Sequence, residues 1–115
     1  MNDDSPQSAA GAAGTEPTRA EVDALVGPWL LEFGAAWCSH CQQAQPLIAA
    51  ACAGHPAVAR LSVEDGRGRR LGRSFRVTLW PTLVFLRDGR EVARLVRPTT
   101  VTDIVQALAM IDPQP

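Results

Sequence analysis

Residues 29–41 read Trp-Leu-Leu-Glu-Phe-Gly-Ala-Ala-Trp-Cys-Ser-His-Cys, and this stretch decides the fold. Its apolar first half, 29–34, is typical of a buried central strand. An alanine-rich, helix-like segment follows over 42–52. Between them lie two cysteines separated by two residues, Cys38 and Cys41. A Cys-x-x-Cys pair between a strand and a helix indicates a redox site, because its thiols can close a disulfide across one helical turn and reopen it.

The position of each cysteine relative to the helix start predicts a different role for each thiol. Cys38 would lie at the N-terminus of the helix, where the helix dipole lowers the pKa of a thiol. Cys41 would lie one turn further in. We therefore expect Cys38 to be the exposed, nucleophilic thiolate and Cys41 to be buried below it.

Two other uses of the cysteine pair were weighed against redox chemistry. A zinc site usually has four ligands in spaced pairs, and only Cys52, His40 and His55 remain as further ligands, so we expect no metal. A permanent structural disulfide is the second alternative.

Cys52 lies eleven residues after Cys41, which is about 16 Å along a helix, whereas a disulfide needs Cα atoms within about 7 Å. We expect Cys52 to be a small buried residue and His55 to be a turn residue.

The composition indicates one globular domain, and it gives no sign of binding to a highly charged partner. A chain of 115 residues can bury a core without disulfides. A net charge of −1 gives no electrostatic reason to expect nucleic acid or membrane binding. All eleven basic residues are arginine, which together with the many Ala and Gly residues indicates a GC-rich genome, and we expect a bacterial source.

The first residues of the chain are small, polar or acidic. They contain neither a basic start nor an apolar run, so they do not resemble a secretory signal. We expect a disordered tail over 1–17 and a folded domain over 18–112. No stretch is apolar and long enough to span a membrane, and we expect a cytoplasmic location.

Capping, turn and periodicity signals predict eight elements in the order α-β-α-β-α-β-β-α. The expected helices cover 18–26, 38–53, 69–74 and 100–110. The expected strands cover 29–34, 58–63, 82–86 and 92–96. Asp88-Gly89 between the last two strands is a strong hairpin signal. This order predicts an α/β fold with a mixed sheet.

Several motifs together resemble the thioredoxin family over residues 20–110. They are the strand and turn Leu31 to Cys38, the pair Cys38-x-x-Cys41 followed by Pro46, the strand 58–63, the segment Phe75-x-Val77-x-x-Trp80-Pro81-Thr82 and the turn Asp88-Gly89-Arg90. The resemblance implies a thioredoxin fold with helices flanking a mixed sheet. The N-terminal tail lacks the β-branched residues of the family's first strand, so we expect four strands, with 58–63 at an edge.

The resemblance also implies roles for individual residues. Cys38 would attack the substrate disulfide and Cys41 would resolve the mixed disulfide. Pro81 would be cis, with its loop packed against the cysteines and its backbone presented to the substrate. Glu32 stands where the family carries a buried carboxylate, which could take a proton from Cys41 through a water, although a Glu at a strand end can also simply reach solvent. Arg60 could pair with Glu32 or be exposed.

Departures from the family pattern lie close to the cysteines. Ser39 and His40 replace the usual Gly-Pro, and a His before the second cysteine resembles protein disulfide isomerases and the bacterial periplasmic oxidase. His40 would stabilise the reduced form and make the disulfide more oxidising, unless it is an ordinary surface residue. Trp80 and Arg97 replace smaller residues and would form a wall that narrows the range of partners, unless Trp80 folds into the core.

The function that these observations favour is that of a protein-disulfide reductase of thioredoxin type. We expect Trp37, Trp80, Pro81 and Arg97 to contact the substrate, and Ser39, His40 and Arg60 to tune the redox pair. The expected partners are protein disulfide substrates and a reductase that donates electrons to this protein. We expect the protein to be a monomer and to need no cofactor. The alternatives are an exported disulfide oxidase or isomerase, and a binding or assembly module, against which the presence of both cysteines argues.

Overall fold

The computed structural model describes residues 16–113, so nearly all of the expected tail over 1–17 lies outside the described residues. All eight expected elements are present in the expected order. They are α2 (Arg19–Asp23), β1 (Pro28–Gly34), α3 (Ser39–Cys52), β2 (Ala59–Glu64), α4 (Arg70–Ser74), β3 (Thr82–Arg87), β4 (Arg90–Val96) and α5 (Val101–Ile111). None of the described helices is both long and apolar enough to cross a membrane.

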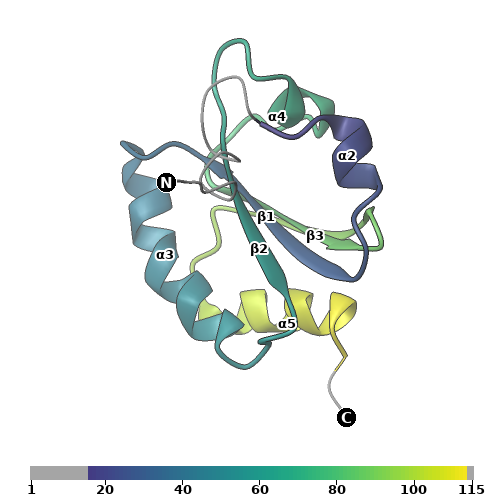
Figure 1. Ribbon diagram of the computed structural model, residues 1–115. Helices are drawn as coiled ribbons and strands as arrows, with labels where there is room; N and C mark the ends of the chain where they lie inside the picture. Colours follow the sequence, from purple (N-terminus) through teal and green to yellow (C-terminus); the bar gives the residue numbers. More distant parts are fainter. Residues whose placement is uncertain (1–15, 114–115) are drawn as a thin grey trace, which may run out of the picture.

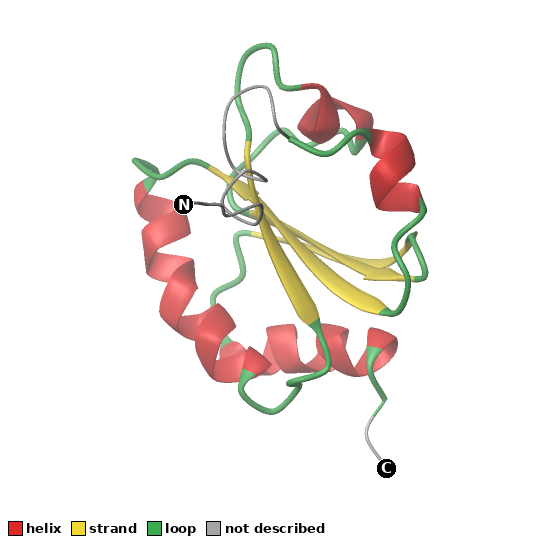
Figure 2. Cartoon of the chain, viewed as in Figure 1, coloured by secondary structure: helices red, strands yellow, loops and turns green. Residues whose placement is uncertain are grey.

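The four strands form one mixed sheet in the order β2-β1-β3-β4. β1 runs parallel to β2 and antiparallel to β3, and β3 pairs antiparallel with β4. Helices α3 and α5 cover one face of the sheet, and α2 and α4 cover the other (Figure 1; Figure 2). The expected thioredoxin fold, with four strands and β2 at an edge, is confirmed.

The two central strands are apolar on both faces because each face is covered by a helical layer. Successive side chains of a strand point to opposite faces. Leu30 of β1 and Phe85 of β3 therefore pack into one buried cluster with α3 and α5. Leu31 and Phe33 of β1, with Val84 of β3, pack into a second cluster with α2 and α4. The continuous apolar pattern of β1 is thus explained by its central place between two layers.

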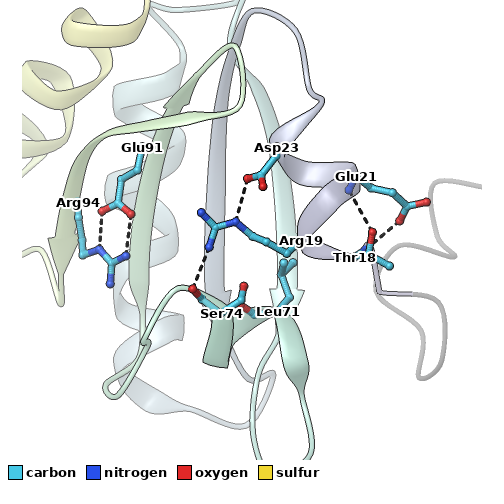
Figure 3. A network of polar contacts seen from close by, with 8 residues as sticks. All are labelled: Thr18, Arg19, Glu21, Asp23, Leu71, Ser74, Glu91 and Arg94. Carbon is cyan, nitrogen blue, oxygen red and sulfur yellow. Dashed lines mark hydrogen bonds and ion pairs between the residues drawn. The ribbon is translucent and has the colours of Figure 1, made fainter.

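Polar contacts join α2 to α4 on the second face (Figure 3). Thr18 and Glu21 form the expected capping box at the start of α2. Arg19 Nε donates to Asp23 Oδ1 at 2.9 Å, and its Nη1 donates to the main-chain oxygen of Ser74 at 2.8 Å. The same view shows Glu91 and Arg94 paired on β4. Arg19 therefore holds the short helix α2 against the end of α4.

Helix α2 ends earlier than the sequence predicts. It stops at Asp23 rather than near Val26, which is exposed. The chain must turn before Pro28 begins β1, and Gly27 makes that turn with a φ of +81°. Asp88 of the β3–β4 turn accepts a hydrogen bond from Gly27 N at 2.8 Å. A contact with a distant turn therefore sets this helix end, and local sequence signals do not report it.

The far ends of α3 and α5 are joined by a contact that the sequence did not predict. His55 lies in the turn after α3, as expected, but it is buried, and its Nδ1 lies 2.9 Å from Asp112 Oδ2. Cys52, in the last turn of α3, is half-buried and packs against the same apolar cluster as α5. This end of α3 therefore belongs to the core, whereas the other end carries the candidate site.

Candidate active site

The sheet and α3 place the two cysteines at the carboxyl end of β1. After Gly34 the chain turns, and Cys38 becomes the N-cap of α3 with an extended backbone. Its Sγ accepts a hydrogen bond from Cys41 N at 3.3 Å. Phe33 pairs with Thr82 across β1 and β3, so Pro81, the residue before Thr82, arrives at the same end of the sheet. The start of α3 and the loop that carries Pro81 therefore meet at the carboxyl end of β1.

The expectation that Cys38 is exposed is wrong, whereas the expected burial of Cys41 is confirmed. Both thiols are free and both residues are largely covered, with 6% of Cys38 and 9% of Cys41 exposed. The reason is that Cys38 turns its Sγ into its own first helical turn, and that Ala35 and Trp80 pack with the two cysteines in a small apolar cluster. The exposed fraction does not distinguish the two thiols, so the difference between them comes from their wider surroundings, which include both the burial of each sulfur among protein atoms and its polar contacts.

Those surroundings shift the pKa values of the two thiols in opposite directions. The pKa of Cys38 is lowered, chiefly by its hydrogen bond with the Cys41 thiol and further by main-chain N–H groups of Cys41 and His40 and by the charge of Arg97, while burial opposes the shift. The pKa of Cys41 is raised to about 11, first by burial and then by its interaction with Cys38. Cys38 is therefore the thiol that ionises first, as the sequence predicts.

The two residues between the cysteines are accessible to solvent. Ser39 and His40 are both exposed. The main-chain N–H of His40, which any residue but proline would supply, helps to lower the pKa of Cys38. The tuning roles of the Ser39 and His40 side chains stay predictions.

Gly34 leaves room for the Cys41 thiol. A Cβ atom added to Gly34 would lie 2.5 Å from Cys41 Sγ, far inside van der Waals contact. Beside this position lies a cavity of about 280 Å³, which is lined by Glu32 and Cys41 together with Phe33, Ile48 and Pro81 among others. Glu32, the buried carboxylate, and the thiol of Cys41 thus face one shared cavity beside Gly34.

Glu32 is buried and paired with Arg60, so it does not reach solvent, whereas Arg60 forms this pair and is itself exposed. Only 5% of Glu32 is exposed. Arg60 Nε donates to Glu32 Oε2 at 2.6 Å, and Arg60 Nη2 donates to Oε1 at 3.1 Å. Gln45 Nε2 also donates to Glu32 Oε1, at 3.3 Å. Gln45 was missed by the sequence analysis, although its place one helical turn after Cys41 could have indicated it.

Trp80 lies beside the cysteines rather than in the main core. It is half-buried against Ala35, Cys38 and Cys41. Its ring meets that of Trp37 edge-on, with centroids 5.5 Å apart, and 73% of Trp37 is exposed. The Trp80–Pro81 peptide bond is cis, as the family resemblance implied. The two indole rings thus form an apolar surface next to the thiols.

Asp65 holds the indole of Trp80 in place, and the sequence analysis missed it. Trp80 Nε1 donates to Asp65 Oδ2 at 2.9 Å. The same carboxylate lies so close to α4 that a Cβ on Gly72 would stand 2.1 Å from Asp65 Oδ1. Gly72 therefore permits the position of Asp65, and Asp65 fixes the orientation of Trp80.

Arg97 reaches Trp80 from the end of β4. Its Nε donates to the main-chain oxygen of Trp80 at 2.7 Å, and its own main-chain N–H donates to Pro81 O at 2.9 Å. Its φ is +52°, a conformation that favours glycine over other residues. Its positive charge lowers the pKa of both Cys38 and Cys41. This electrostatic effect on the thiols adds to the substrate contact that the sequence predicted for Arg97.

The fold and this site define a protein built around a Cys-x-x-Cys pair at a helix N-terminus beside a cis-proline loop. Residues 15–110 match the family model described as Thioredoxin. The chain therefore belongs to the thioredoxin family.

Known proteins of this family resemble the chain over different lengths. The structure of thioredoxin 2 from Pseudomonas aeruginosa PAO1 in its reduced form is 57% identical, covers 89% of this chain and 91% of that chain, and superimposes with a TM-score of 0.76. A thioredoxin domain-containing protein of Theileria parva is 36% identical over 76 residues, which are 64% of this chain and 34% of that protein. A thioredoxin of Chlamydia trachomatis is 36% identical over 67 residues, which are 58% of this chain and 66% of that protein. The matches thus span less than two thirds of these two curated relatives.

Proposed function

We propose that this protein is a thiol–disulfide oxidoreductase that reduces protein disulfides with Cys38 and Cys41. The observation that carries the proposal is the placement of Cys38 as the N-cap of α3, where its Sγ accepts the Cys41 N–H and its pKa is lowered. A thiolate is the attacking species in disulfide exchange. The neighbouring thiol of Cys41 is close enough to Cys38 to complete the exchange within one helical turn.

The reaction proceeds in two exchanges. The Cys38 thiolate attacks one sulfur of the substrate disulfide, which forms a mixed disulfide and releases the other substrate sulfur as a thiolate that takes up a proton. Cys41 then loses its proton and attacks Cys38 Sγ. This step breaks the mixed disulfide, frees the second substrate thiol and leaves the Cys38–Cys41 disulfide. Two electrons have passed to the substrate, and a separate reductase restores the dithiol.

The first exchange prepares Cys41 for the second. In the dithiol form, the interaction with Cys38 contributes to the raised pKa of Cys41. Once Cys38 is bonded to substrate it no longer carries negative charge, so this contribution disappears and Cys41 loses its proton more easily. Glu32, a buried carboxylate that lines the same cavity as Cys41, is the group that would take that proton through a water. The Arg60 guanidinium orients that carboxylate through two hydrogen bonds.

A second candidate, an oxidase or isomerase, is favoured by the charges around Cys38. Arg97 and the main-chain N–H groups stabilise the Cys38 thiolate, and stabilising the reduced form makes a disulfide a stronger oxidant. A reduction potential near the thioredoxin value of about −270 mV supports the reductase, and one near or above about −180 mV supports the isomerase or oxidase. A cytoplasmic location stays a prediction.

Trapping of the mixed disulfide tests the proposed roles. With Cys41→Ser the first exchange still occurs, so incubation with a protein disulfide such as insulin should accumulate a covalent adduct on Cys38. Reducing agent should release the adduct. Cys38→Ser is the matched variant, and it should accumulate no adduct. Adduct formation through Cys41 in the Cys38→Ser protein would reverse the assignment, and the absence of any adduct with either variant would contradict the proposed function.

A further inference from the structure

Four arginines surround an open hollow on the side of Trp80 that faces α4. Arg67 and Arg69 come from the loop after β2, Arg73 from α4, and Arg76 from the turn after it. We call this feature the basic hollow. It has a volume of about 610 Å³, and Asp65, Val77, Thr78 and Trp80 are among its other lining residues.

The charge of the basic hollow is not neutralised by the fold. Among residues 16–113, none of its four guanidinium groups forms an ion pair with a carboxylate. Its lining includes one acidic residue, Asp65, whose carboxylate accepts the Trp80 indole N–H and is pressed against α4. The lining thus carries four positive and one negative side chain in a chain with a net charge of −1. Such a local excess attracts an anionic partner.

Trp80 connects the basic hollow to the redox pair. One side of this residue lines the hollow, and the residue also packs with Cys38 and Cys41. Arg97 contacts the main chain of Trp80 and adds a further positive charge close to the thiols. A chain segment that lies in the hollow and continues across Trp80 would therefore bring its own sulfur to Cys38.

We propose that the basic hollow binds an acidic segment next to the disulfide of a protein substrate. This inference rests on the proposed function and names the class of substrate for it. A polypeptide fits better than a nucleic acid because Trp80 both lines the hollow and packs against the two cysteines, and a polypeptide can supply both the negative charge and the disulfide. Guanidinium groups also bind carboxylates through paired hydrogen bonds.

The experiment compares two disulfide peptides that differ only in a flanking run of Asp and Glu or of Asn and Gln. The full chain should reduce the acidic peptide about tenfold faster than the neutral peptide at about 0.01 M salt. The preference should disappear at about 1 M salt, where charges are screened within about 3 Å. Equal rates for the two peptides at low salt would overturn the inference while leaving the proposed function intact.

Two double variants show whether the preference comes from the basic hollow. Arg67→Gln/Arg73→Gln removes two of its charges at exposed positions. Arg87→Gln/Arg90→Gln is the matched control, because these residues pair across β3 and β4 at the other end of the sheet and carry the same charge. The first variant should lose most of the preference for the acidic peptide and keep its rate with the neutral peptide. The control should behave as the wild type, and an equal loss in both variants would show a general charge effect and overturn the inference.

A binding measurement separates this inference from the redox function. The Cys38→Ser protein is titrated with an acidic peptide that contains no cysteine, and tryptophan fluorescence reports binding. Binding that is weakened by Arg67→Gln/Arg73→Gln supports the basic hollow even if neither disulfide peptide is reduced, a result that would contradict only the proposed function. Absence of binding, or tighter binding of a single-stranded oligonucleotide at the same arginines, would overturn the inference.

Discussion

The two ends of α3 carry cysteines in opposite chemical situations. At the N-terminal end, the hydrogen bond with the Cys41 thiol, main-chain N–H groups and Arg97 lower the pKa of Cys38. At the C-terminal end, burial raises the pKa of Cys52, and the nearby charge of Arg60 only partly opposes this shift. The residue type and the helix are the same, so position on the helix and the neighbouring charges decide which thiol is reactive.

The same difference extends to the packing around the two ends. The C-terminal end is closed by the contact between His55 and Asp112 and by apolar packing against α5. The N-terminal end is bounded by two indole rings, a cis-proline loop and a cavity. One end therefore stabilises the fold, and the other leaves space next to a thiol.

Replacement of the cysteine at each end should have very different effects on activity. Cys38→Ser should reduce disulfide reductase activity to background, because the thiolate nucleophile is lost. Cys52→Ser, the matched variant at the other end, should keep activity within about twofold of the wild type, since a pKa raised by burial keeps this thiol protonated and unreactive. Insulin reduction measures both. Comparable loss in the two variants would show that the contrast between the ends does not govern the chemistry.

Glycine substitutions at the two ends should differ in stability. Gly34→Ala places a Cβ 2.5 Å from Cys41 Sγ, and overpacking of this kind costs about 1–3 kcal/mol in the free energy of unfolding. Gly54→Ala is the control after the C-terminal end, where the new Cβ would find its nearest neighbour, Ala51 O, at 4.0 Å. Denaturant unfolding of the reduced proteins should show a loss for Gly34→Ala alone. Equal stability of the two variants would mean that Cys41 moves aside freely.

Arg97 should affect the first thiol through its charge and the stability through its backbone. Arg97→Gln removes the charge and should raise the pKa of Cys38, by a small amount because the guanidinium is exposed and screened. Arg97→Lys should keep the wild-type pKa. Arg97→Gly should give the same pKa change as Arg97→Gln and gain up to about 1 kcal/mol in unfolding free energy, since glycine suits a φ of +52°. If Cys38 had the same pKa in all three variants, the charge of Arg97 would not contribute to that pKa.

The sequence predicted those parts of the structure that depend on local patterns. The order of the elements followed from periodicity, caps and the Asp88-Gly89 turn, and the redox pair followed from its spacing before a helix. The end of α2 was missed because a hydrogen bond from Gly27 to the distant Asp88 helps to set the turn there. The covered position of Cys38 was missed because its Sγ turns back toward its own helix.

Contacts made across the fold were the other part that the sequence could not predict. Asp65 and Trp80 are separated by fifteen residues, and Trp80 and Arg97 by seventeen. Neither pair belongs to a periodic pattern, so only the assembled sheet shows that they meet beside the thiols. The same holds for the basic hollow, whose four arginines read in sequence as an ordinary polar loop and short helix.

The central claim is that position along α3 sets the ionisation of each thiol, and the pH dependence of alkylation measures this directly. The reduced protein is treated with iodoacetamide over a range of pH, and each cysteine is quantified by mass spectrometry. Only thiolates react, so a lowered pKa moves the alkylation of Cys38 to a pH below the ordinary thiol value of 9.0. Cys52 should need a pH above 9.0, and Cys41, whose pKa is raised to about 11 while Cys38 is a free thiol, should be alkylated only after Cys38. A Cys38 profile that coincides with that of Cys41 or Cys52 would contradict the account.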